Sequence, residues 1–315
     1  MAVPEVVVND AHCHFFSTPF FAALGRQLKD AEQGAPQETA LGTLGWDAPG
    51  TADALADRWV AEFDRVGVAR GALIASVPGD AGSVATAVAR HPRRLVGFFM
   101  VDPTQPDAAA GAAASLDAGG LRAMCLFPAM HRFAIQDDRV RHIFDVAAAR
   151  PGTAVFVHCG VLTVGVRGKL GLPSPFDIRH GNPLDLQAIA AGYPTVPVII
   201  PHFGAGLFRE ALMVADLCPN VHLDTSSSNG WIKYHNGLTL AAVFRQALSV
   251  VGSDRLLFGS DSSFFPRGWV HHVFEAQSSA LDEIGAGDVR GKVFGGNFDR
   301  LFPPSSESKG PAEAG

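Results

Sequence analysis

Short, almost uninterrupted apolar runs recur along the chain, and each is followed by a segment with the pattern of a helix. A continuous apolar run is typical of a parallel strand covered on both faces, whereas a strand with one face in water alternates. The runs span residues 6–10, 71–77, 95–102, 121–128, 154–160, 196–204, 221–227 and 256–264. This repetition constrains the fold most, because neighbouring parallel strands need a crossover connection.

The segments between the runs carry helix signals. Residues 51–66 begin with Thr51 and Asp53, which suit a helix N-terminus, and repeat apolar residues at helical spacing. Segment 238–252 ends on Gly252, as a helix often does. Eight strands with helical crossovers in 315 residues predict an α/β fold, a (β/α)₈ TIM barrel. A doubly wound open sheet is the competitor, but the first strand-to-helix turn has no glycine-rich phosphate loop.

We expect residues 1–302 to form a single barrel domain and the tail at 303–315 to be disordered. Two irregular insertions interrupt the pattern, at 15–50 after the first strand and at 161–183 after the fifth. Both follow the carboxyl end of a strand, the face on which barrel enzymes carry their active sites. Insertions of this length predict a lid or a wall for a substrate.

Charge and cysteine usage limit the partners. The formal net charge is −6, and the longest basic block is Arg93-Arg94, so we expect no nucleic-acid partner. No apolar run approaches the length of a membrane span, and the N-terminal residues lack an export signal. The four cysteines show no CxxC pairing, which suits reduced thiols in a cytoplasmic protein. The expected ligand is therefore a small molecule.

The first apolar run ends in the stretch "NDAHCHFF", residues 9–16. In a strand, residues two apart point to the same side, so His12 and His14 face one way and Cys13 the other. Two neutral imidazoles that converge inside a barrel commonly bind a divalent metal. Twelve histidines make one HxH by chance unremarkable, so the motif needs support from other strands.

That support comes from three further strand ends. His158 follows the fifth run, His202 the sixth, and Asp261 the eighth. An ionisable residue directly after a buried strand is costly unless it has a partner. Because all these strand ends meet at one rim of a barrel, together they predict a metal site there.

The same residues carry a family resemblance. The chain resembles the amidohydrolase superfamily, specifically the amidohydrolase-related branch that includes aminocarboxymuconate-semialdehyde decarboxylase. The matching pieces are "DAHCHFF", "VFVHCG", "VIIPHFGAG", "LDTSS", "LLFGSDSSFFP" and the closing "VFGGNFDRLF". They extend from residue 6 to residue 302, in the order of that family.

The resemblance implies a metal held by His12, His14, His158 and Asp261, with His202 beside it as a catalytic base or substrate-polarising group. Binuclear members of the superfamily commonly bridge two metals with a carboxylated lysine on the fourth strand. No lysine of this chain lies in a predicted strand, so we expect one metal ion. Imidazole and carboxylate ligands suit Zn²⁺ most readily, with Mn²⁺ as an alternative.

This centre predicts a hydrolase of a small C–O or C–N bond, such as a lactone, ester or amide. Zn²⁺ lowers the pKa of its water to about 7, and Asp261 can accept a proton and pass it to the leaving group. His202 can hydrogen-bond the attacked carbonyl. The alternative is a nonoxidative decarboxylase of an unsaturated or aromatic carboxylic acid. A third reading is a catalytically silent binding protein on this fold, which would need an empty metal site despite the intact ligand set.

Arginines on the catalytic side are candidates for binding a substrate carboxylate, because the planar guanidinium donates two parallel hydrogen bonds. The candidates are Arg132, Arg167, Arg179 and Arg267, with Trp231 as a possible pocket wall. Lys233, His235, His131 and His180 share that rim, and Asp224 can orient a neighbouring histidine. A homodimer would be ordinary for the family.

Overall fold

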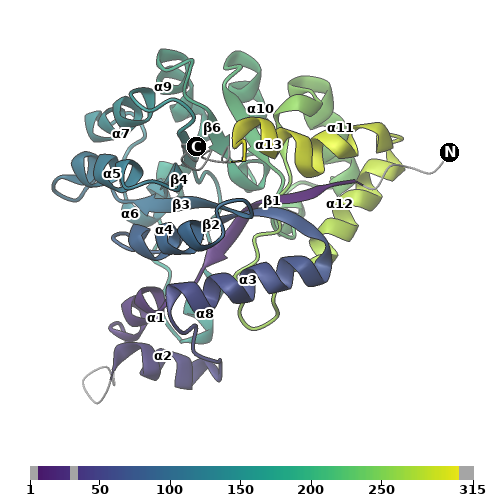
Figure 1. The fold of residues 1–315 in the computed structure, drawn as a ribbon. Helices are drawn as coiled ribbons and strands as arrows, with labels where there is room; N and C mark the ends of the chain where they lie inside the picture. The colour runs from purple at the N-terminus through teal and green to yellow at the C-terminus, as the bar shows by residue number, and fades with distance from the viewer. Residues whose placement is uncertain (1–5, 29–34, 305–315) are drawn as a thin grey trace, which may run out of the picture.

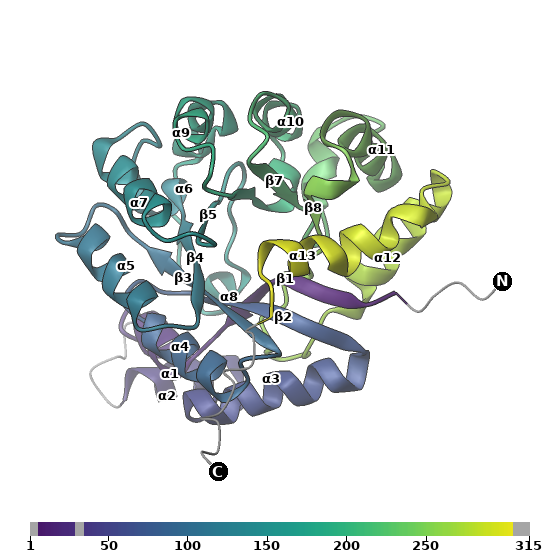
Figure 2. The ribbon, with the colours of Figure 1, turned by 45° about the horizontal axis from the view of Figure 1, so that its top comes forward.

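The computed structural model of the chain describes residues 6–28 and 35–304. Eight parallel strands lie in sequence order around one sheet, which confirms the predicted barrel (Figures 1 and 2). The eighth strand continues past its last ladder pair and bonds to the first: Ala11 N donates to Phe258 O, and His14 N donates to Ser262 O. The strands are β1 (Val8–Phe15), β2 (Val68–Ala75), β3 (Leu95–Val101), β4 (Leu121–Leu126), β5 (Ala154–Val157), β6 (Val198–Ile200), β7 (Val221–Asp224) and β8 (Leu256–Leu257).

Helices surround the barrel, as Figure 2 shows. Thr51 accepts a hydrogen bond from Ala54 N and begins the helix predicted at 51–66, and Gly252 ends another in a positive-φ conformation. The capping residues therefore begin and end these helices where the sequence predicts. The surrounding helices are α3 (Ala52–Val66), α4 (Ala81–Arg90), α5 (Ala108–Asp117), α7 (Asp138–Ala148), α9 (Gln187–Gly192), α10 (Phe208–Leu217), α11 (Leu240–Val251) and α12 (His271–Glu283).

Two apolar cores result from this arrangement. One lies between the sheet and the helices, and the other fills the barrel with side chains such as Ile74, Phe98 and Phe156. The short helix α13 (Asn297–Leu301) closes the amino-terminal end of the barrel, where the Arg70 guanidinium lies 5.2 Å from the Phe298 ring centroid. The interior is thus packed at that end, and polar side chains gather at the opposite mouth.

The insertion at 15–50 is more regular than we predicted. It contains α1 (Thr18–Gly25) and α2 (Pro36–Leu44), because Ser17 caps α1 and the apolar residues Phe20, Phe21 and Leu24 are buried. The insertion at 161–183 contains α8 (Gly165–Lys169) and the 3₁₀ turn Ile178–Gly181. Figure 1 shows α1, α2 and α8 grouped on the side toward which β1 points. Pro303 and Pro304 are described, and the rest of the predicted tail lies outside the described residues.

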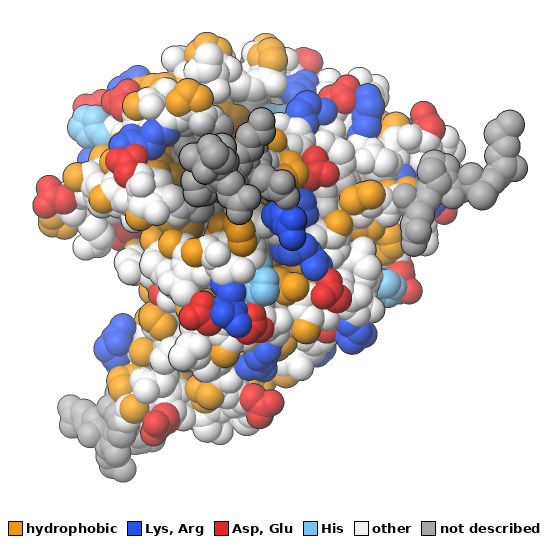
Figure 3. Space-filling view, in the orientation of Figure 1, with side chains coloured by type: hydrophobic (Ala, Val, Ile, Leu, Met, Phe, Trp, Pro, Cys, Tyr) orange, Lys and Arg blue, Asp and Glu red, His pale blue; other side chains and the backbone are white. Residues whose placement is uncertain are grey.

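The surface is mixed in charge. On the face shown in Figure 3, acidic and basic side chains are interspersed. Within residues 6–28 and 35–304, no helix has the length and apolarity needed to cross a membrane.

Candidate metal centre

A β-bulge in β1 aims the two histidines. Between Asp10 and Cys13 the strand advances three residues, while its partner β2 advances only two, from Gly71 to Leu73. The extra residue re-aims the strand at its carboxyl end. His12 and His14 consequently lie on one side, with ring centroids 5.1 Å apart, and Cys13 packs between the sheet and the helices.

Asp261 faces both imidazoles from the end of β8. Its backbone has a φ of 61° and its N–H donates to His12 O, which ties the residue to β1. Asp261 Oδ1 lies 3.1 Å from His14 Nε2 and 3.5 Å from His12 Nε2. Ligand atoms of a tetrahedral site with bonds of 2.0–2.2 Å stand about 3.4 Å apart, so these spacings suit a shared cation. His12, His14 and Asp261 therefore form a candidate metal site.

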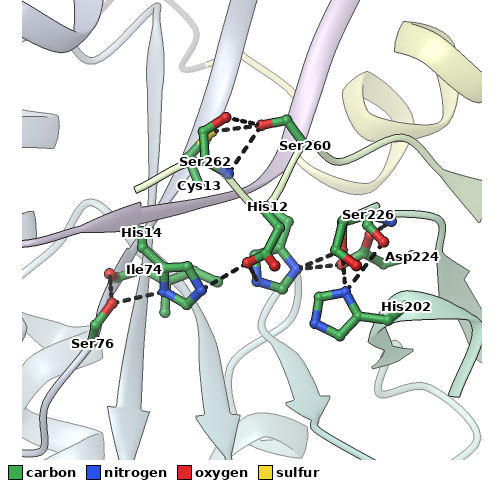
Figure 4. A network of polar contacts seen from close by, with 12 residues as sticks. His12, Cys13, His14, Ile74, Ser76, His202, Asp224, Ser226, Ser260 and Ser262 are labelled. Carbon is green, nitrogen blue, oxygen red and sulfur yellow. Dashed lines mark hydrogen bonds and ion pairs between the residues drawn. The ribbon is translucent and has the colours of Figure 1, made fainter. Parts of the chain in front are cut away.

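The remaining ring nitrogens of the two histidines are held by other side chains (Figure 4). His12 Nδ1 lies 2.6 Å from Asp224 Oδ2, and the carboxylate can only accept the proton. His14 Nδ1 lies 2.8 Å from Ser76 Oγ, whose own proton goes to Ile74 O. Both Nδ1 atoms therefore have partners of their own, so that Nε2 of each ring faces Asp261 and is the atom that would ligate a metal once its proton is lost.

His158 adds a polar group that lacks a partner. The residue follows β5, is buried, and stacks on Phe127 at a centroid distance of 5.5 Å. Among the described residues, nothing hydrogen-bonds its buried Nδ1. Burial, followed by the nearby His202 and His12, holds the pKa of His158 well below its usual value, so the ring is neutral. The candidate metal group of His12, His14 and Asp261 does not include His158, so its place as a fourth ligand stays a prediction, which the unpartnered Nδ1 supports.

His202 stands beside the three histidines at the start of the 3₁₀ turn Pro201–Gly204, with a φ of 55°. Its ring centroid lies 5.0 Å from that of His12 and 5.3 Å from that of His158. Its Nδ1 lies 2.8 Å from Ser226 Oγ and 3.3 Å from Ser226 O. Burial lowers the pKa of His202, so the imidazole is neutral near pH 7.

Burial and neighbouring charged groups have opposite effects on the pKa values of Asp261 and His12. Burial alone would raise the pKa of Asp261, but the His14 hydrogen bond and the nearby imidazoles hold that pKa below its usual value. Burial alone would lower the pKa of His12, but the carboxylate of Asp224 outweighs it and raises the pKa. The site thus keeps an ionised carboxylate next to imidazoles of different basicity.

A cavity of about 910 Å³ opens over the centre. The imidazoles of His12, His14, His158 and His202 line it together with Asp261. Of the predicted substrate-binding residues, those that line the cavity are Arg132, Arg167, Arg267 and Trp231. Lys233 also lines it, whereas His131, His180 and His235 do not.

The structure corrects the expectation for Arg179. Its side chain is 86% exposed and lies outside the cavity, with Nη2 at 2.6 Å from Asp177 Oδ2. The cause is local, because Asp177 accepts from both the backbone and the guanidinium of Arg179 at the start of a 3₁₀ turn. A loop position on the catalytic side does not by itself direct a side chain inward.

Several supporting residues were not predicted. Ser76 follows the buried end of β2, so the strand-end signal that selected His158 would also have found it. Ser226 follows buried β7 and carried the same signal, whereas Lys169 had none. Asp10 is buried and accepts from His12 N, Ser260 N and Trp269 Nε1, which joins β1 to the segment after β8. Its place in "NDAHCHFF" suggested a strand end but not this role.

Parallel strands closed into a barrel, with histidines and a carboxylate at their carboxyl ends, define a TIM barrel that carries a candidate metal site at the face where such barrels have their active sites. The family model described as amidohydrolase matches residues 9–303, and the chain belongs to the amidohydrolase family.

Solved structures share the fold. The fold is similar to that of a 5-carboxyvanillate decarboxylase from Novosphingobium aromaticivorans with bound manganese, with a TM-score of 0.64, 14% identity, and coverage of 95% of this chain and 97% of that one. It is also similar to a protein from Pseudomonas putida assigned as a 2-pyrone-4,6-dicarboxylic acid hydrolase, with a TM-score of 0.58, 18% identity, and coverage of 96% and 100%. At these identities the likeness concerns the fold.

A curated relative matches a shorter stretch. Over 90 residues the chain is 34% identical to protein fluG of Emericella nidulans, which is 29% of this chain. The match spans only 10% of the fluG protein.

Proposed function

We propose that the protein is a mononuclear metal-dependent hydrolase that cleaves a small C–O or C–N bond in a lactone, ester or amide. The observation that carries this proposal is the convergence of His12 Nε2 and His14 Nε2 on Asp261 Oδ1, with both Nδ1 atoms occupied elsewhere. Such an arrangement orients two imidazoles and one carboxylate to bind a cation before the cation arrives.

The proposed ligands are His12, His14, His158 and Asp261. One metal ion is favoured because the lysines among the described residues lie outside the strands, which leaves no lysine on β4 to bridge a second ion. The mixed nitrogen and oxygen donors suit Zn²⁺, with Mn²⁺ as the alternative. A divalent cation at this centre would lower the pKa of a water molecule and polarise a substrate oxygen.

Two side chains are proposed to transfer protons and to stabilise charge during the reaction. Asp261 accepts the proton of the attacking water and returns it to the leaving group, a role that suits a carboxylate kept ionised by neighbouring imidazoles. His202 faces the cavity beside the ligands and stabilises the charge that develops on the attacked carbonyl oxygen. Both residues are thus proposed as catalytic.

The lining charges indicate an anionic substrate. Five cationic side chains line the cavity, and Asp261 is the only carboxylate among its described lining residues. Those cations are Arg132, Arg167, Lys169, Lys233 and Arg267. Arginine pairs well with a carboxylate, so the substrate is proposed to carry one.

This charge pattern also supports a second candidate, the nonoxidative decarboxylation of an unsaturated or aromatic acid. In that reaction the C–C bond to the carboxylate breaks, its electron pair stays on the substrate carbon, and that carbon takes up a proton. His202 would deliver the proton.

All four cysteines are free and buried, which supports a reducing compartment, and we place the protein in the cytoplasm.

Metal analysis followed by a substrate panel tests these proposals. The protein is loaded with one equivalent of Zn²⁺ or Mn²⁺ and offered lactones, esters, amides and aromatic carboxylic acids. Proton release from lactones and esters, amine release from amides, and carbon dioxide are recorded separately. Proton or amine release without carbon dioxide supports the hydrolase, carbon dioxide without hydrolysis supports the decarboxylase, and failure to bind a metal contradicts both.

A further inference from the structure

We propose that Ser226 is a positioning residue that selects the tautomer of His202. Its hydroxyl proton is directed to His202 Nδ1, which leaves the single N–H of the neutral imidazole on Nε2, toward the cavity. The use of that N–H in catalysis rests on the proposed function, whereas the tautomer itself is a property of the protein alone.

Ser226 stands between two histidines. It follows β7 and is fully buried, and its backbone N–H donates to Asp224 Oδ1 at 2.7 Å. Its Oγ lies 3.0 Å from His12 Nδ1 and 2.8 Å from His202 Nδ1, as Figure 4 shows. The hydroxyl carries one proton and can donate it to only one of these two ring nitrogens.

Asp224 decides the direction at His12. The 2.6 Å contact between Asp224 Oδ2 and His12 Nδ1 requires a proton on that nitrogen, because an ionised carboxylate only accepts. Ser226 cannot donate to a nitrogen that already carries hydrogen. Its O–H then has one acceptor left among the described residues, His202 Nδ1.

The opposite tautomer is less favourable. With hydrogen on His202 Nδ1, the Ser226 hydroxyl would be buried without an acceptor, a state that folded proteins avoid. The Ser226 carbonyl lies 3.3 Å from Nδ1, beyond the usual range for an N–H···O hydrogen bond. The hydroxyl contact at 2.8 Å is the better of the two and sets the tautomer.

The consequence concerns the role of His202. A neutral imidazole with hydrogen on Nε2 donates a hydrogen bond into the cavity and does not accept one there. His202 then acts on a developing oxyanion, or supplies a proton to carbon, but does not act as the base that activates water. Asp224 therefore orients His12 directly and, through Ser226, also determines what His202 presents to a substrate.

The test uses imidazole ¹⁵N shifts, which distinguish a protonated ring nitrogen from an unprotonated one without any turnover. Protein labelled with ¹⁵N-histidine is recorded at pH 7.5, free of metal and with one equivalent of Zn²⁺. The signals of His202 are identified by their loss in His202→Gln. We expect hydrogen on Nε2 in both samples, with an excess on the order of tenfold or more over the other tautomer.

Variants separate positioning from structure. In Ser226→Ala the carbonyl of residue 226 is the one partner of Nδ1 that remains among the described residues, so the proton of His202 should move to Nδ1. Ser226→Thr restores the hydroxyl and should restore the original tautomer. Thr225→Val is the matched control, because it removes a neighbouring buried hydroxyl that bonds Gln277 on the helix side. It should leave the shifts of His202 unchanged.

The outcomes are distinct. Hydrogen on Nδ1 in the wild type overturns the proposal, as does hydrogen on Nε2 in a folded Ser226→Ala. If Ser226→Ala does not fold, the wild-type shifts still decide. The expected shifts together with no activity on the substrate panel would leave the tautomer assignment standing and contradict the proposed function.

Discussion

His12 and Asp224 are 212 residues apart in the chain, and their side chains meet at 2.6 Å between Nδ1 and Oδ2. Both are buried at the carboxyl ends of strands, one on β1 and the other at the end of β7. A carboxylate on the far side of a metal-binding imidazole fixes the orientation and the tautomer of the ring, and it raises the basicity of the ligating nitrogen. The metal affinity of the centre should therefore depend on a residue that does not touch the metal.

Replacing Asp224 by Asn tests this dependence. The variant keeps the size of the side chain but removes the charge that holds the Nδ1 proton of His12. We expect a 10- to 100-fold loss of Zn²⁺ affinity, as is typical when such a partner is lost. The affinity is measured by competition with a chelator of known strength. Asp137→Asn, the same substitution at the cap of α7, is the control and should leave the affinity unchanged, since Asn caps a helix as well as Asp does. An unchanged affinity in Asp224→Asn would contradict the role.

Removal of a proposed ligand should cost more. Asp261→Asn is preferred to Asp261→Ala because residue 261 has a φ of 61°, a conformation that Asn tolerates better. We expect the variant to lose metal more completely than Asp224→Asn, with far-UV circular dichroism unchanged. Elemental analysis of the purified protein measures the metal content. A variant that still holds one equivalent of metal would show that Asp261 is not a ligand.

His202→Asn separates catalysis from metal binding. Asn again suits the positive φ of 55°, so the backbone should be retained. With His202 as a catalytic group rather than a ligand, the variant should keep its metal while kcat falls by about 10²- to 10³-fold. Metal content and single-turnover rate are measured on the same preparation. Loss of the metal instead would make His202 a ligand.

The fold was predictable because it depends on repetition along the chain. Each buried strand corresponds to a continuous apolar run in the sequence. For helices such as α3, the sequence indicates both the N-terminal cap and the residues of the buried face. The insertion at 15–50 was less predictable. Its helices depend on packing against distant residues, as in the stack of Trp46 on Phe265 after β8.

The candidate site was predictable where a side chain follows a buried strand. His158, His202 and Asp261 were predicted this way, and His12 and His14 from their alternation in the first strand. All five line one cavity, because the barrel brings every strand end to one mouth. Arg179 shows the limit of that reasoning, since a nearby carboxylate decides where a loop side chain points. Ser226 shows another, because a serine has no pattern that reveals which of two histidines will receive its proton.

Arg267 should contribute to binding an anionic substrate. It lines the cavity, and no hydrogen bond or ion pair to another described residue restrains its guanidinium. A hydrogen-bonded charge pair contributes about 1.5–3 kcal/mol, so Arg267→Gln should lower kcat/KM for a carboxylate substrate by roughly 10- to 100-fold. Arg179→Gln is the matched control outside the cavity and should have no effect. The effect should shrink for the corresponding uncharged ester, and equal losses on both substrates would argue against a role in anion binding.

His222 on β7 should make stability depend on pH. Burial, followed by the charges of Arg255 and Arg300, lowers the pKa of His222 to about 4 from its ordinary value of 6.5. Between these values the unfolded chain binds a proton that the folded protein does not, so the free energy of unfolding falls as the pH drops from 6.5 to 4. At 1.36 kcal/mol per pH unit, the contribution lost is at most about 3 kcal/mol.

Urea unfolding at pH 7.5 and pH 4.5 measures this contribution, with both proteins free of metal so that the metal-site histidines contribute equally. His222→Gln cannot titrate and should lose less stability across this range than the wild type. His142→Gln, at an exposed position on α7, is the control and should behave like the wild type. If His222→Gln and the wild type lose the same stability, His222 is protonated as readily in the folded protein as in the unfolded chain, and its burial has no electrostatic cost.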